Sequence, residues 1–156
     1  MIMNDSNADQ LGRLSSGPRD DRLQAADDRL KLPRGAFIAF RQSGGLRFST
    51  REVMVYHDGR VVARRQGKLD TREGSWRITP DEMGDLKAAI AHSGLRDLPR
   101  FSSIGQQNPD GYAYELIARA GRKLKSIEFF DGSIPAEVQP LLAQLRTLMA
   151  VDDAQE

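Results

Sequence analysis

The dipeptide Asp58-Gly59 lies between two segments that alternate apolar and polar residues, and it constrains the fold more than any other feature of this chain. Asp-Gly favours a tight type I′ hairpin turn because both residues tolerate a positive φ angle. The flanking segments, residues 46–57 and 60–66, have the period-two pattern of half-buried strands. The sequence therefore predicts an antiparallel hairpin, and with it a sheet.

Further strands are predicted by apolar runs or by alternation, at residues 36–40, at Trp76 and Ile78, and at 112–119 and 124–130. Gly-rich and polar segments separate these strands. Ser43-Gly44-Gly45 predicts a chain reversal after the first strand, and residues 67–74 and 99–111 have the composition of loops. The expected strands are mostly neighbours in sequence, which favours antiparallel pairing.

Two helices are predicted near the middle and the end of the chain. Thr79-Pro80-Asp81-Glu82 combines an N-cap, a proline at the first helical position and the acid of a capping box. From Pro135 onward, leucines recur at three- and four-residue spacing. Pro140 lies early in this segment, so the helix either begins near Glu137 or bends at the proline.

These elements predict an α+β fold, with an antiparallel sheet of about five to six strands and two helices packed on one face. Residues 35–150 form the expected single domain. Residues 1–34 are polar and predict a flexible tail, in which Leu23, Ala26 and Leu30 could share one stripe of a marginal or partner-docking helix. The acidic residues 151–156 are expected to fray.

The residue types give little support for catalysis. Cysteine is absent, which excludes disulfides, thiol chemistry and thiolate metal sites. The histidines are His57 and His92, and they lack the closely spaced partners of a zinc site. Asp110 and Glu115 could act as paired acids, but they flank a turn. We therefore expect no enzyme activity, no cofactor and no metal.

Charge and hydropathy narrow the choice of partner and location. No stretch has the roughly 20 apolar residues that span a bilayer, and no secretory signal precedes the domain, so a cytoplasmic protein without membrane contact is expected. The formal net charge is +1, which makes nucleic acid an unlikely partner. The basic strand from Arg60 to Arg65 is interpreted as a solvated edge strand, with RNA or phosphate binding as a less favoured alternative.

A series of landmarks occurs in a fixed order along the chain. It consists of Arg41-Gln42-Ser43-Gly44-Gly45, Asp58-Gly59-Arg60, Ile78-Thr79-Pro80-Asp81-Glu82, Leu98-Pro99, Pro109-Asp110-Gly111-Tyr112-Ala113-Tyr114-Glu115-Leu116, and Ile134-Pro135 leading to Pro140-Leu141-Leu142-Ala143-Gln144-Leu145. Over about residues 36–150 this series resembles the emfourin-type family, small bacterial protein inhibitors of thermolysin-like metalloproteases.

The resemblance implies a non-catalytic α+β domain that presents loops to a protease. It points to Ser43, Gly44, Gly45 and Leu46 as the partner-binding residues, with Leu46 entering an apolar specificity pocket. The family usually follows the glycine pair with an aromatic or aliphatic residue and then Ala-Gly, whereas this chain reads Leu46-Arg47-Phe48-Ser49. Two alternatives stay open: the glycines serve only a turn, and the domain is a general protein-binding module without inhibitory activity.

Overall fold

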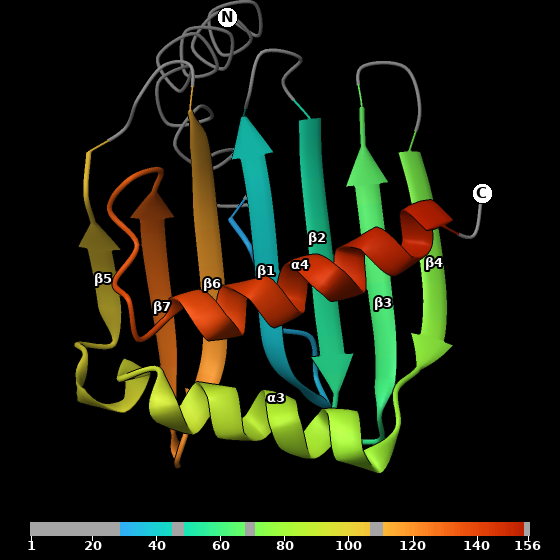
Figure 1. Cartoon of the computed structure of the whole chain (residues 1–156), viewed down its shortest axis with the longest axis horizontal. Coiled ribbons are helices and arrows are strands. Elements are labelled where there is room, and N and C mark those ends of the chain that lie inside the picture. Colours follow the sequence, from blue (N-terminus) through green and yellow to red (C-terminus); the bar gives the residue numbers. More distant parts are fainter. Residues whose placement is uncertain (1–28, 45–48, 68–70, 107–110, 155–156) are drawn as a thin grey trace, which may run out of the picture.

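The computed structural model describes residues 29–44, 49–67, 71–106 and 111–154. Within these residues the chain forms one seven-stranded sheet in the order β4-β3-β2-β1-β6-β7-β5, with helices α3 and α4 on one face (Figure 1). The strands are β1 (Ala36–Gly44), β2 (Ser49–Tyr56), β3 (Arg60–Gln66), β4 (Thr71–Arg77), β5 (Phe101–Ile104), β6 (Tyr112–Ala120) and β7 (Lys123–Phe130). The predicted α+β class is confirmed, and the sheet is larger than the expected five to six strands.

The predicted hairpin at Asp58-Gly59 is confirmed, but its turn is not a two-residue type I′ turn. β2 ends at Tyr56 and β3 begins at Arg60, so three residues connect them. The Gly59 N–H donates to the Tyr56 carbonyl at 3.0 Å, and Gly59 has a φ of 91°. A three-residue connection that ends in a left-handed glycine is the next most common way to join two antiparallel strands.

Two strands lie where the sequence predicts loops. β4 begins at Thr71, inside the predicted loop 67–74, although its end at Trp76 was predicted as a strand, and β5 lies inside the predicted loop 99–111. Both are edge strands whose residues are largely exposed, so they lack the apolar alternation that marks a half-buried strand. β5 is also the strand that pairs in parallel, with β7. Its pairing depends on residues more than twenty positions away, which local sequence cannot reveal.

Helix α3 (Pro80–His92) begins where the sequence predicts it. The Glu82 N–H donates to Thr79 Oγ1 at 3.1 Å, and the Thr79 N–H donates to Glu82 Oε1 at 3.2 Å, which completes the capping box. After α3, Gly94 adopts a φ of 79°, and the short 3₁₀ helix η1 (Leu95–Asp97) follows. Leu95 is fully buried beneath the helix.

Helix α4 (Gln139–Ala154) resolves the two alternatives for Pro140. The helix begins at Gln139, so the proline occupies the first turn, where its missing N–H would have no partner within the helix. The backbone is helical to Ala154, and the fraying of residues 151–156 stays a prediction. Neither helix is long and apolar enough to cross a membrane within the described residues.

The main core lies between the sheet and the two helices. Phe40, Phe129 and Leu116 from the sheet are fully buried with Leu86 of α3 and Leu145 of α4. This core accounts for the apolar stripes of both helices and for alternate residues of the inner strands. The two helices therefore cover the same face of the sheet, as predicted (Figure 1).

The opposite face of the sheet, called the open face below, carries a smaller apolar cluster. Leu30 is buried there against Ala39, Met54 and Ile117. Leu30 belongs to the segment predicted to be a polar tail, so packing extends N-terminal to the predicted domain start at residue 35. It is not helical, and its expected helical neighbours Leu23 and Ala26 lie outside the described residues.

Candidate functional site

The predicted partner-binding residues lie at and beyond one end of β1. Ser43 and Gly44 are strand residues, paired with Thr50 and Ser49 of β2 on one side and with Ala113 and Tyr112 of β6 on the other. The prediction that the chain already reverses at Ser43 and Gly44 is therefore wrong, because β1 continues through both. Gly45 and Leu46 lie outside the described residues.

Gly44 is needed at its position for two independent reasons. Its φ of 113° lies in the region that L side chains rarely adopt. A Cβ atom added there would also lie 2.7 Å from the carbonyl oxygen of Gly111, at the start of β6. The two sequence landmarks that are about sixty residues apart, the glycine pair and the segment that leads into Tyr112, are thus in direct contact.

Asp131 holds this end of the sheet in place. Its Oδ2 accepts the Tyr112 N–H at 2.6 Å, and its Oδ1 accepts the Tyr114 hydroxyl at 2.7 Å. The Asp131 N–H in turn donates to the Tyr112 carbonyl at 3.2 Å. Tyr114 also stacks on Phe40 and lies under the guanidinium of Arg146 from α4. The start of β6, against which Gly44 packs, is therefore fixed by side chains from β1, from α4 and from the turn after β7.

The environment of Tyr114 indicates that the stability of the fold depends on the ionisation of its hydroxyl group. Burial, and next the hydrogen bond to Asp131, raise the pKa of Tyr114 to about 12 from its ordinary 10.0. A raised folded-state pKa means that the neutral phenol stabilises the fold fully below pH 10.0, and that this contribution is lost as pH rises through about 12. A spectrophotometric titration should show a late tyrosinate step that is absent from Tyr114→Phe, and an unchanged titration in that variant would contradict the assignment.

The open face carries a row of alternating charges, called the charged row, formed by Glu73, Arg64, Glu52, Arg41 and Glu115, which lie opposite one another on neighbouring strands. Arg41 Nε donates to Glu52 Oε1 at 2.7 Å, and Arg41 Nη1 lies 3.7 Å from Glu115 Oε2. Glu115 also accepts the Leu30 N–H at 3.1 Å. Glu115, considered above as one of two paired acids, thus contacts Arg41 and the N-terminal segment, and Asp110 lies outside the described residues.

The interpretation of the basic strand as a sheet edge is wrong. β3 lies between β2 and β4. Val61 and Ala63 are buried toward the helices, and Arg64 belongs to the charged row, 3.9 Å from Glu52 and 3.4 Å from Glu73. Arg60 covers the ring of Tyr56 at 4.1 Å. Arg64 therefore pairs with acids and Arg60 covers an aromatic ring, so the two do not form a purely basic surface.

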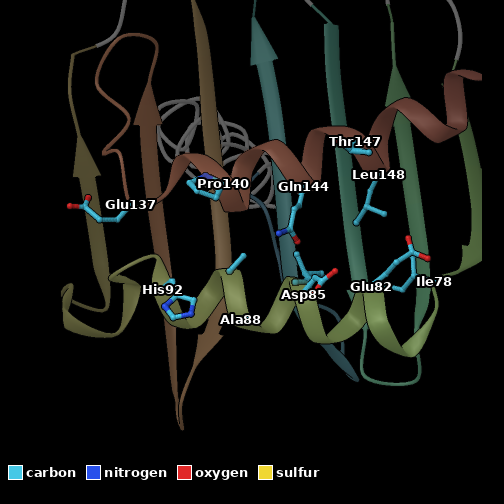
Figure 2. Close-up of a pocket in the computed structure, with 12 residues that line it drawn as sticks. Ile78, Glu82, Asp85, Ala88, His92, Glu137, Pro140, Gln144, Thr147 and Leu148 are labelled. Atoms are coloured by element: carbon cyan, nitrogen blue, oxygen red, sulfur yellow. The ribbon is translucent and has the colours of Figure 1, made fainter.

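A groove of about 590 Å³ separates α3 from α4 (Figure 2). Its lining is mainly apolar, from Ile78, Leu86, Ala89, Pro140 and Leu148, and it also includes carboxylates of α3 and of the segment just before α4. Figure 2 shows Glu82 and Asp85 on the α3 side and Glu137 near the start of α4. Such a groove can bind an apolar side chain or segment.

The two histidines do not form a common site. His57 packs beside the ring of Phe37 at 5.4 Å, at the β2–β3 turn, whereas His92 lines the groove at the end of α3. No group of three or more potential metal ligands exists among the residues that the structure describes.

Comparison of the chain with protein-family models and with curated proteins finds no match. The resemblance to the emfourin-type family therefore stays a prediction. The structure adds residues that sequence reasoning did not assign to the site. Asp131 is one of them, and nothing in the sequence around it indicates that its carboxylate reaches Tyr112 and Tyr114. The groove depends on how two separate helices pack.

Proposed function

We propose that this chain is a non-catalytic protein-binding domain that inhibits a thermolysin-like metalloprotease through Ser43, Gly44, Gly45 and Leu46. The observation that carries the proposal is the contact between the two most characteristic landmarks of the resemblance. Gly44 packs against the backbone of Gly111, and Asp131 fixes the neighbouring Tyr112. The segment that would enter the protease therefore begins from a rigid base.

A rigid base matters for an inhibitor because binding then orders fewer groups. Fixing a binding segment in advance lowers the entropic cost of association, and it also disfavours the rearrangements that cleavage needs. In this proposal the glycines allow the backbone to approach the protease closely, and Leu46 fills an apolar pocket near the catalytic zinc of the protease. The inhibitor itself supplies no metal ligand and no reacting group.

The test is a titration of nanomolar thermolysin-like protease with the intact chain. We expect stoichiometric inhibition, and we expect Leu46→Arg to weaken it by about 30-fold or more because it would place a charge in an apolar pocket. Leu11→Arg makes the same exchange far from this segment in sequence and should inhibit like the natural chain. Thermal unfolding of each variant checks that the fold is retained.

The outcomes separate the proposal from its alternative. Inhibition that Leu46→Arg leaves unchanged would remove this segment from the mechanism. No inhibition by the natural chain across several thermolysin-like proteases would overturn the inhibitor proposal and favour a protein-binding module without inhibitory activity. The apolar groove between α3 and α4, bordered by Glu82, Asp85 and Glu137, is the feature that favours such a module.

A further inference from the structure

We propose that β4 is an interaction surface for a second copy of this chain, and that the two β4 strands pair antiparallel about a two-fold axis at Ser75. β4 is the terminal strand of the sheet, hydrogen-bonded to β3 on one side. No described strand pairs with its other edge, and the C-terminal end of α4 crosses β4 in Figure 1. A lateral strand of seven residues presents backbone donors and acceptors that another strand can satisfy.

The sequence of β4 is complementary to itself in one register. With the axis at Ser75, Glu73 lies opposite Arg77 of the second copy, and this pair occurs twice because of the symmetry. Both side chains point to the open face, since Glu73 belongs to the charged row and Arg77 lies four residues further along the strand. They are exposed by 55% and 70%, so both can reach across a new strand pair.

The same register also matches residues on the helix face. It places Gly74 of one copy opposite Trp76 of the other. Trp76 is half-buried against the main core, and Gly74 offers the indole ring space that a side chain would occupy. Aromatic residues across from glycine stabilise strand pairs because the ring covers the exposed glycine backbone.

Neighbouring registers lose this match. Moving the axis to Gly74 places Glu73 opposite Ser75 and Arg77 opposite Thr71, so neither charge has an opposite charge across from it. Moving it to Glu73 places the two carboxylates opposite each other, which is destabilising. At the Ser75 axis the new pairs instead extend existing contacts, because Arg64 lies 3.4 Å from Glu73 and Asp58 lies 3.9 Å from Arg77. Arg77 of the second copy then lies near two acids, Glu73 across the junction and Asp58 of its own chain, although Arg60 is its direct neighbour on β3.

The first test is sedimentation equilibrium of the full chain over a range of concentrations. A strand pair is a small interface, so we expect a dimer with a dissociation constant of roughly 10–100 µM. Glu73→Arg and Arg77→Glu should each weaken the homodimer about tenfold or more, because each places like charges opposite one another twice. An equimolar mixture of the two variants should dimerise again, because every pair across the axis is then of opposite charge.

The second test fixes the register. The chain has no cysteine, so Ser75→Cys introduces a single thiol at the proposed axis. Under mild oxidation it should form a covalent dimer, since residues directly opposite on antiparallel strands approach disulfide distance. Ser103→Cys is the matched control, an exposed serine of the strand at the other edge of the sheet, and should form no covalent dimer.

A chain that remains monomeric at all concentrations would overturn the proposal. So would a dimer that neither charge variant weakens, a mixture of variants that fails to re-form dimers, or equal crosslinking of the two cysteine variants. Circular dichroism of each variant identifies any loss of dimer that comes from unfolding, and the Ser75→Cys result is independent of the charge changes.

Discussion

Replacing Phe40 with alanine is expected to lower the free energy of unfolding by about 3–5 kcal/mol. Phe40 is fully buried in β1, the central strand of the sheet, and its ring stacks on Tyr114 at a centroid distance of 6.1 Å. Truncation removes the transfer free energy of the ring and leaves a cavity, because strands on both sides prevent the site from collapsing.

Phe101→Ala is the matched control for this substitution. Phe101 is 68% exposed on β5, so losing its ring should change stability by no more than about 0.5 kcal/mol. Urea titrations followed by circular dichroism measure both variants, and equal slopes would show that the denatured states are comparable. A loss at Phe40 no larger than that at Phe101 would contradict the position of Phe40 in the main core.

Replacing Gly44 with alanine is expected to lower the free energy of unfolding more than replacing a left-handed glycine at which an added Cβ would contact no other atom. Its φ of 113° alone should cost alanine about 1–3 kcal/mol. The added Cβ would also lie 2.7 Å from the Gly111 carbonyl oxygen, a backbone atom that cannot rotate away. β1 and β6 must therefore separate at this end of the sheet, which weakens the contact between the two landmarks.

Gly132→Ala provides the comparison. Gly132 has a φ of 82°, but no atom lies within 4 Å of an added Cβ, so this variant reports the conformational cost alone. Thermal or urea unfolding of both variants should show a larger loss at Gly44, and the difference measures the collision with Gly111. Equal losses of stability in the two variants would mean that the end of β1 moves away from Gly111 at little cost in free energy. The proposed inhibitory segment would then lack its rigid base.

Much of the fold is predictable because its signals are local. The capping box at Thr79, the hairpin at Asp58-Gly59 and the leucine spacing of α4 each act within a few residues. The missed strand β5 and the strand β4, of which only the end at Trp76 was predicted, lie at the two edges of the sheet. Edge strands bury little apolar surface, so their sequences need not alternate, and their formation depends on pairing with a neighbour already in place.

Only part of the candidate site could be predicted from local sequence. The glycine pair indicated Ser43 and Gly44 as site residues. The sequence, however, predicted a turn at these two residues, whereas they lie at the end of β1. The partners that define their surroundings, Gly111 and Asp131, are distant in sequence. A hydrogen bond between residues nineteen positions apart leaves no periodic pattern, because it requires one acceptor at one point in space.

By itself the sequence determined that this chain forms an α+β domain with two amphipathic helices on a mostly antiparallel sheet, because hydrophobic period, caps and turns are properties of short segments. Only the tertiary structure decided which strands lie at the edges of the sheet, β4 among them, and that Gly44 must be glycine. These features arise where segments distant in sequence meet, and the contact there depends on packing and backbone pairing that no single segment encodes.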